Sequence, residues 1–477
     1  MTEGAAILSS ETGFTLLALM SLLWIGLGFY WGRGDDSLAG HMLAGRNVGL
    51  ALGAATGVAT WITSNTTMLA PQFALQMGIW GMIAYSTASI GLFMFAPLAE
   101  RIRALMPEGY TSAEFVRLRY GALANYVFLA ISIFYAFTWL ISMAIAGGLL
   151  LQSLSGIDYL YGMTAILSVC TLYTIVGGLR AVIGTDFIQS GIILLGVIIV
   201  AIATLNAVPI HDVYVQLKAN RPALLDMFFP AAMMALFNNL LFGIGEIFHS
   251  NVWWSRAFAM REGVGRKAYM IAGMLWLPIP VAAGFIALAA PALGINVPHV
   301  NMVGPIVAGE LLGKAGALVV FVTVFASIAS SIDSLLAATS DLITKDIVGG
   351  FLWKSATDAQ LRQATTYITL GLALCTWATC ATENADLATI LFRAGPLVGS
   401  TIWPILAGLY WKRANATGAV LGMALGTSAG LYAYYEVGWY SAALVGTAVS
   451  SLAVISSAWL RRETFDFSRL ARAEVGA

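Results

Sequence analysis

Hydroxyl side chains form a stripe along a predicted helix over residues 303–340. Ser327, Ser331 and Ser334 follow one another at i, i+4 and i+7, and Ser330 lies beside them. Residues at this spacing share one face of a helix, so their oxygen atoms point in the same direction. Hard oxygen ligands suit a small alkali cation better than a thiophilic metal. The stripe therefore predicts a binding site for a cation such as sodium.

Two carboxylates lie in apolar stretches, where lipid is expected. Asp333 adjoins the serine stripe, and Asp186 lies at the start of a predicted helix over 187–207. Ionisable side chains inside a membrane are costly and by default mark the path of an ion or a proton. Two other interpretations stay open: Asp186 could cap the start of its helix, and Asp333 could make a structural hydrogen bond within the helix bundle.

Two further apolar segments, 48–72 and 228–254, carry more polar residues than a lipid-facing helix has reason to hold. The first contains Thr60, Thr63, Ser64, Asn65, Thr66 and Thr67, and the second contains Asn238, Asn239 and Glu246. A helix broken near 59–65, and a second broken at Gly243 and Gly245, would free carbonyls that are tolerated only around a cavity or an ion. The alternative for the first segment is helix–helix contact through Ser and Thr side chains. We predict two interrupted helices.

Other polar or aromatic residues in apolar stretches carry weaker signals. Trp253 and Trp254 precede basic residues, which is typical of the aromatic belt at a membrane interface. Arg393 could either extend to the outer interface or gate a pathway. The three cysteines show no metal or disulfide spacing. Motifs for a zinc protease, a P-loop ATPase or a nucleophile elbow are absent from the sequence, so it predicts no enzyme.

The elements that hold these residues must be membrane helices. The chain has 477 residues, of which 59% are hydrophobic and only 10% are charged, with a mean hydropathy of +0.83. A soluble domain is usually about 25% charged, so this chain has too few charged residues to cover the surface of a water-soluble protein. The 24 basic and 24 acidic residues balance, which excludes a nucleic-acid binder. The composition is that of an all-α polytopic membrane protein.

A transmembrane helix needs roughly 20 apolar residues. By this criterion the sequence predicts thirteen transmembrane helices in one domain, residues 1–477. The predicted spans lie near 12–32, 48–72, 77–99, 123–151, 159–178, 187–207, 228–254, 268–291, 303–340, 364–381, 386–411, 416–436 and 439–460. Most of the 24 Lys and Arg residues, Arg256 among them, fall on alternate loops. Because basic loops stay in the cytoplasm, we predict an outside N-terminus and a cytoplasmic C-terminus.

Two of these polar stretches resemble a known family. GGLRAVIGTDFIQSGIILLG (177–196) and SIASSIDSLLAATSDLITKDI (327–347) are similar to the sodium:solute symporter family around its fifth and eighth core helices. Within that family, TWITSNTTMLAPQFALQMGIWG, YTSAEFVRLRYG (110–121), NVWWSRAFA and WPILAGLYWKRAN (403–415) look most like the urea-active transporter branch. The resemblance covers residues 38–420.

This resemblance implies a LeuT-like core of two inverted five-helix repeats over about 48–411, with one helix before it and two after. It implies a sodium ion bound by backbone oxygens of Ala59, Ile62 and Ser327 with the side chains of Ser330 and Ser331. It also implies a possible second cation or a proton at Asp186, Asp333 and Ser334. The solute would lie between the two breaks, near Thr60, Ser64, Asn65, Asn238, Asn239 and Glu246.

The expected function is therefore that of a cation-coupled secondary symporter in the plasma (cell inner) membrane. Sodium is the expected coupling ion, with a proton as the alternative, and urea or a related small polar solute is the expected cargo. An amino acid, a monocarboxylate or a polyamine would be alternative solutes. A transporter-like sensor and a passive facilitator are the other classes kept open. Beyond the solute and the lipid bilayer, the sequence points to no protein or nucleic-acid partner.

Overall fold

The computed structural model describes residues 6–33, 37–295, 297, 300–382, 387–461 and 464–472. In these residues the chain is helical and no strand forms, apart from a single parallel bridge between Val48 and Met260. The all-α prediction is confirmed for this part of the chain.

The described residues up to 249 form ten α-helices. They are α1 (Ser10–Gly32), α2 (Leu38–Leu43), α3 (Leu50–Trp61), α4 (Ala70–Ser86), α5 (Ser89–Leu105), α6 (Ser112–Tyr120), α7 (Ala122–Ser155), α8 (Tyr159–Ala207), α9 (Ile210–Asn220) and α10 (Pro230–His249).

Nine more α-helices follow in the described residues after 250. They are α11 (Asn251–Ala259), α12 (Gly265–Trp276), α13 (Pro278–Leu293), α14 (Val303–Leu342), α15 (Asp358–Cys380), α16 (Leu387–Arg393), α17 (Gly395–Tyr410), α18 (Ala416–Glu436) and α19 (Trp439–Leu460). A π-helical stretch at Asn65–Leu69 leads into α4, and another at Ile343–Leu352 continues α14.

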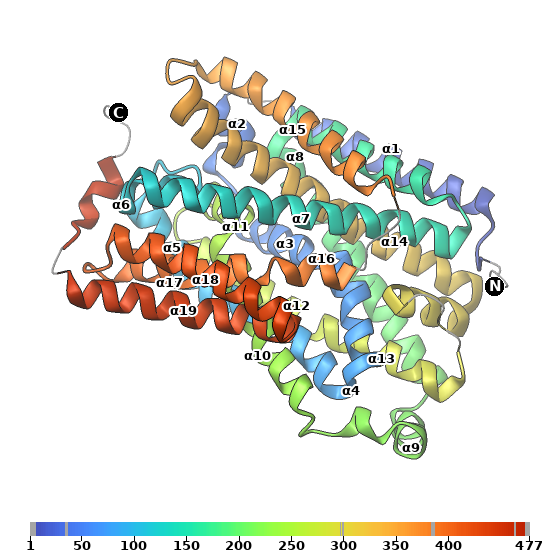
Figure 1. Cartoon of the computed structure of the whole chain (residues 1–477). Coiled ribbons are helices and arrows are strands. Elements are labelled where there is room, and N and C mark those ends of the chain that lie inside the picture. The colour runs from blue at the N-terminus through green and yellow to red at the C-terminus, as the bar shows by residue number, and fades with distance from the viewer. Residues whose placement is uncertain are drawn as a thin grey trace.

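Within the described residues, eight stretches of helix are long and apolar enough to cross a membrane. This supports an integral multi-pass membrane protein, and the full count of thirteen spans stays a prediction. Figure 1 shows the long helices lying side by side, with α1 beginning at one end of the bundle and α19 ending at the other. Inside the bundle, α8 packs against α1, α3, α7 and α14, so α8 and α14 form its central pair.

The helix predicted to break near 59–65 does so. α3 ends at Trp61, Ile62 leaves the helical conformation with ψ 81°, and the chain resumes as a π-helix at Asn65. Hydroxyl groups compete for the backbone here, because Thr66 Oγ1 donates to the Trp61 carbonyl at 3.0 Å and Thr63 Oγ1 accepts from the Asn65 amide at 3.0 Å. Ser, Thr and Asn side chains offer such local alternatives to the helical ladder.

The second predicted break is displaced. Gly243 and Gly245 lie inside the continuous helix α10, and the interruption comes at Ser250, whose extended conformation (ψ 131°) separates α10 from α11. The two glycines serve close packing instead. A Cβ at 243 would meet Ala88, and one at 245 would lie 2.6 Å from the Val398 carbonyl oxygen. Placing the break at the glycines was wrong.

α8 runs across two predicted spans and turns at Gly178, which has φ +53°. A Cβ at this position would overlap the carbonyl oxygen and the ring of His41, which lies in α2. Burial and, to a smaller extent, Arg362 lower the pKa of His41 to about 4, so its ring packs there as a neutral group at pH 7. The kink thus depends on a residue without a side chain.

We expect Gly178→Ala to lower the free energy of unfolding by about 1–3 kcal/mol, because alanine is strained at positive φ and its Cβ has no room. Gly191→Ala is the matched control in the same helix, where no atom lies within 4 Å of the added Cβ. Thermal unfolding of the purified protein in detergent measures both. Equal melting temperatures for the two variants would contradict this account of the kink.

Candidate functional site

A buried ion pair lies at the centre of the bundle. Arg256 of α11 and Asp186 of α8 are both fully buried, and the guanidinium Nη2 lies 3.2 Å from Asp186 Oδ2. Thr56 of α3 donates its hydroxyl to the same oxygen at 2.5 Å and accepts a hydrogen bond from Arg256 Nε at 2.9 Å. Three helices that are distant in the chain therefore meet at one pair of charges.

The guanidinium also reaches the serine stripe. Arg256 Nη2 donates to Thr60 Oγ1 at 2.8 Å and to Ser334 Oγ at 2.6 Å, and these two hydroxyls are 3.1 Å apart. A guanidinium has five N–H donors and stays charged in a protein, so a buried arginine needs several hydrogen-bond acceptors. α14 is thereby joined to the same network as α3, α8 and α11.

This network changes three sequence predictions. Asp186 lies inside α8, so its interpretation as a helix cap was wrong. Asp186 and Ser334 have no direct hydrogen bond to each other, because both accept from Arg256 Nη2. Arg256 was assigned to a cytoplasmic loop and is instead fully buried, so that assignment was also wrong. The apolar residues on both sides of Arg256, such as Val252 and Phe258, were the signal that could have placed it inside.

Asp333 is bonded to residues of α8 other than Asp186. Its Oδ2 accepts a hydrogen bond from Tyr173 at 2.6 Å and another from Thr185 at 3.5 Å, both on α8. These bonds match the structural interpretation that the sequence left open for Asp333. Asp333 therefore fastens α14 to α8 one position away from the serine that meets Arg256.

The predicted sodium ligands gather where the broken end of α3 meets α14. Ser330 Oγ donates to the Ala59 carbonyl at 2.8 Å, and Ser331 Oγ lies 3.5 Å from the Thr60 carbonyl. The same two hydroxyls lie 3.2 and 2.9 Å from the Ser327 carbonyl. Ile62 is buried at the helix end, but its contacts in the described chain do not include a hydrogen bond to either serine.

These groups are chemically suited to a small hard cation. Two hydroxyls and several carbonyls supply neutral oxygen atoms, the ligands that alkali ions prefer. In this structure the hydroxyls donate to the carbonyls, and rotating the hydroxyl hydrogens away would turn their lone pairs toward an ion. The next carbonyl, that of Trp61, is already satisfied by the Trp276 indole at 2.7 Å.

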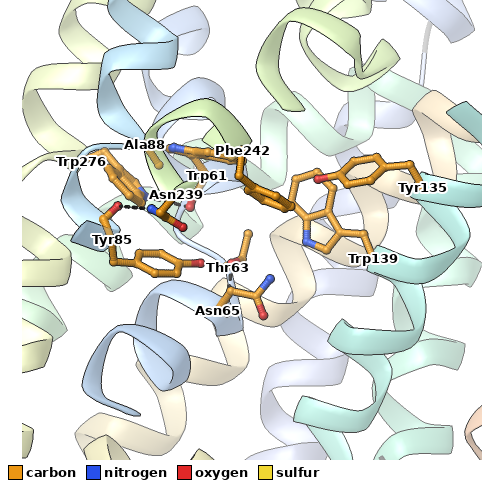
Figure 2. Close-up of a pocket in the computed structure, with 10 residues that line it drawn as sticks. All are labelled: Trp61, Thr63, Asn65, Tyr85, Ala88, Tyr135, Trp139, Asn239, Phe242 and Trp276. Carbon is orange, nitrogen blue, oxygen red and sulfur yellow. Dashed lines mark hydrogen bonds between the residues drawn. The ribbon is translucent and has the colours of Figure 1, made fainter. Parts of the chain in front are cut away.

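A small, partly open cavity lies just beyond the end of α3 (Figure 2). Its lining is mostly aromatic and consists of Trp61, Thr63, Asn65, Tyr85, Ala88, Tyr135, Trp139, Asn239, Phe242 and Trp276. Asn239 is held in place because its Nδ2 donates to the Ala84 carbonyl at 2.8 Å. The Tyr85 hydroxyl points toward Thr63 across the cavity (Figure 2). The lining carries several polar groups and no formal charge.

Two of the six predicted solute residues, Asn65 and Asn239, line this cavity. The other four make contacts elsewhere in the bundle. Thr60 joins the Arg256 network, Ser64 donates to Met143 Sδ at 3.2 Å, Asn238 accepts from the Ala443 amide at 2.8 Å, and Glu246 accepts from Trp253 Nε1 at 2.9 Å. The aromatic lining was missed by sequence reasoning, because its members are widely spaced and look like ordinary membrane aromatics.

Trp253 and Trp254 are both fully buried, so their assignment to an interfacial belt was wrong. Trp254 Nε1 donates to the Phe248 carbonyl at 2.7 Å, which ties α11 back to α10. Arg393 is exposed at the end of α16, 6.0 Å from the centre of the Tyr435 ring, and does not line the cavity.

Comparison with known proteins adds three findings. The model of the sodium:solute symporter family matches residues 41–426. A urea-proton symporter of Oryza sativa subsp. japonica is 26% identical over 83% of this chain and 60% of its own length. The osmoregulated proline transporter OpuE of Bacillus subtilis is 26% identical over 84% of both chains. The chain thus spans about three fifths of the length of the urea transporter it matches.

Solved structures agree with the observed arrangement of helices. A Na⁺-coupled sialic acid symporter in a substrate-bound outward-open state superimposes with a TM-score of 0.82, at 18% identity, over 95% of this chain and 98% of the other. The nucleobase-cation symporter Mhp1 in a closed conformation gives a TM-score of 0.55 at 17% identity, over 92% of this chain and 99% of the other. At these identities the likeness shows the fold alone.

We expect Arg256→Gln to lower the free energy of unfolding by about 3–5 kcal/mol, because it leaves Asp186 buried without its counter-charge. The double variant Asp186→Asn/Arg256→Gln should recover part of this loss, since no charge stays buried. The control is Arg266→Gln, which breaks an exposed pair with Glu100 (3.7 Å) and should cost at most about 1 kcal/mol. Thermal unfolding in detergent compares them. A double variant no more stable than Arg256→Gln would contradict the assignment.

Proposed function

Because the chain belongs to the sodium:solute symporter family, we propose that it couples entry of a small polar solute to entry of a sodium ion. The chain is a membrane transporter and not an enzyme. The observation that carries the proposal is the pair Ser330 and Ser331, whose hydroxyls lie against the carbonyls of Ala59 and Thr60 at the broken end of α3.

In this proposal, sodium binds between α3 and α14 on oxygens of Ala59, Ile62, Ser327, Ser330 and Ser331. The ion would join two helices that otherwise meet through long or shared hydrogen bonds. A ligand shifts a conformational equilibrium only by its difference in affinity for the two states. Sodium would therefore stabilise the state in which α3 packs on α14, and the residues after the break would take up their solute-binding positions in that state.

The arginine network supports one ion rather than two. The second cation predicted near Asp186, Asp333 and Ser334 would need the position that the Arg256 guanidinium holds, 3.2 Å from Asp186 Oδ2 and 2.6 Å from Ser334 Oγ. We infer that Arg256 acts as a fixed internal cation there. Coupling would then rest on the sodium site at the serines.

The cavity favours an uncharged solute. Two side-chain amides and three hydroxyls of the lining can exchange hydrogen bonds with a solute, while aromatic rings cover its faces. These polar groups belong to Asn65, Asn239, Thr63, Tyr85 and Tyr135. A zwitterionic amino acid would bury two unpaired charges among these groups, which is costly. Urea is flat, neutral and rich in donors and acceptors, so we propose urea or a close amide relative as the solute. The name of the rice relative, a urea-proton symporter, is consistent with this choice.

We further propose the finer architecture expected for the family. Thirteen spans would form two inverted repeats, the first opened by α3 and the second by α10 and α11, with the N-terminus outside and the C-terminus in the cytoplasm. The two helix interruptions, at Ile62 to Ser64 and at Ser250, support this pairing. The plasma (cell inner) membrane is the proposed location.

Proteoliposomes containing the purified chain test the coupling. We expect radiolabelled urea to accumulate under an inward sodium gradient. Ser331→Ala should raise the sodium concentration for half-maximal uptake at least about tenfold, because it removes an ion ligand and even the loss of an outer-shell partner costs a metal site about tenfold or more. Ser340→Ala is the control, because its hydroxyl bonds only within α14, to the Ala337 carbonyl at 3.0 Å. Unchanged sodium dependence in Ser331→Ala would refute the site, and uptake without accumulation would indicate a passive facilitator.

A second variant tests the solute site. We expect Asn65→Ala to raise the urea concentration for half-maximal uptake by up to about tenfold, the effect of losing one hydrogen bond. Asn125→Ala is the control, since Asn125 is equally buried in α7 but does not line the cavity. Equal effects of the two variants on urea affinity would place the solute elsewhere.

A further inference from the structure

The polar side chains of the cavity lining are of two kinds. Thr63, Tyr85 and Tyr135 carry hydroxyls, which can either donate or accept because the hydrogen rotates. Asn65 and Asn239 carry amides, in which the nitrogen can only donate and the oxygen can only accept. A fixed preference for donors or acceptors in a solute must therefore come from the two amides.

Asn239 presents its oxygen to the cavity. Its Nδ2 donates to the carbonyls of Ala84 at 2.8 Å and Tyr85 at 3.4 Å, in the last turn of α4, where carbonyls lack partners within the helix. A carbonyl can only accept, so these two bonds fix which end of the amide is the nitrogen. Oδ1 has no hydrogen-bond partner in the described chain, and Figure 2 shows it turned toward the interior of the cavity.

Asn65 presents its nitrogen. Its Oδ1 accepts a hydrogen bond from Ser142 Oγ of α7 at 3.3 Å. Ser142 is fully buried and its hydroxyl has no other acceptor in the described chain, so a reversed amide would leave that hydroxyl without an acceptor, which is costly. Asn65 Nδ2 is left without a partner among the described residues, and Figure 2 shows it on the cavity side. The lining thus keeps one fixed donor and one fixed acceptor for a solute.

The solute that complements these two atoms carries both a carbonyl oxygen and an N–H group. Asn65 Nδ2 needs an acceptor and Asn239 Oδ1 needs a donor, and both side chains are buried, so an atom left unpaired by the bound solute lowers its affinity. A ketone offers only an acceptor. A zwitterionic amino acid offers both kinds of group, but it brings two charges into a lining that holds no counter-charge. A neutral primary amide offers both without a charge.

We propose that Asn65 and Asn239 determine solute specificity as a pair, with Asn65 donating to the carbonyl oxygen of a neutral primary amide and Asn239 accepting from its N–H group. This inference rests on the proposed function and deepens it. The carbonyl of the solute faces the broken end of α3, and its amino group faces α10. A second amino group is not required, so small primary amides other than urea bind as well. Ser142 is a positioning residue, because it holds the Asn65 amide in this orientation.

The test compares solutes of the same shape. Urea, acetamide and acetone share one skeleton around a trigonal carbon and carry two, one and no amino groups, while thiourea replaces the oxygen of urea by sulfur, a weak acceptor. Binding of radiolabelled urea to the purified protein in sodium buffer is measured with each of the others as competitor. Acetone should bind more weakly than acetamide, and thiourea more weakly than urea, by about tenfold or more in each case. L-Proline should not compete.

Each variant should remove one of the two preferences and keep the other. Asn239→Ala should make acetone and acetamide equally effective but keep the preference for urea over thiourea. Asn65→Ala should do the reverse. Ser142→Ala, which frees the Asn65 amide to turn, should weaken only the preference for urea over thiourea. Asn125→Ala is again the control and should keep both preferences, because Asn125 is buried in α7 away from the cavity.

The wild-type series decides the matter without depending on how well a variant folds. Acetone that competes as well as acetamide would overturn the inference, and so would L-proline that competes better than acetamide, or the absence of saturable urea binding. Loss of both preferences in Asn239→Ala or in Asn65→Ala would also overturn it. The expected binding order without sodium-driven urea accumulation in proteoliposomes would instead overturn the proposed symport.

Discussion

The ion pair of Arg256 and Asp186 is the interaction on which the rest of the interior depends. Removing two charges from water costs several kcal/mol per ion, so the pair persists only because its remaining hydrogen-bonding capacity is used. The guanidinium donates its further hydrogen bonds to the hydroxyls of Thr56 and Thr60 on α3 and of Ser334 on α14. The charge requirement of one guanidinium thus fixes the mutual position of four helices, including the two that hold the proposed sodium site.

The ion and the solute are proposed to bind to one short piece of backbone. The carbonyls of Ala59 and Thr60 face the serines of α14, while the side chains of Trp61 and Thr63 line the cavity. No long pathway is required between the two sites, because the same broken helix end contributes to both. A movement of α3 that loosened the carbonyls from α14 would also displace the cavity wall.

The sequence predicted the features that depend on local spacing. The serine stripe follows from helical periodicity, and the break in α3 follows from a run of hydroxyl and amide side chains that compete with the backbone. The position of Arg256 could not be predicted in this way, because its side-chain partners lie 70 to 200 residues away in the chain. The aromatic cavity could not be predicted for the same reason, since its lining comes from five helices that are spread along the chain. The second break was misplaced because glycine signals both flexibility and close packing, and here Gly243 and Gly245 serve packing.

The uncharged lining of the cavity has an electrical consequence. If the solute is neutral, every charge that crosses with it belongs to the coupling ion, so transport generates a current inward. Moving one elementary charge through a membrane potential of 100 mV is worth about 2.3 kcal/mol, or roughly a fiftyfold concentration ratio. A cell with a negative interior would therefore drive accumulation by its voltage even where the sodium concentrations on the two sides are equal.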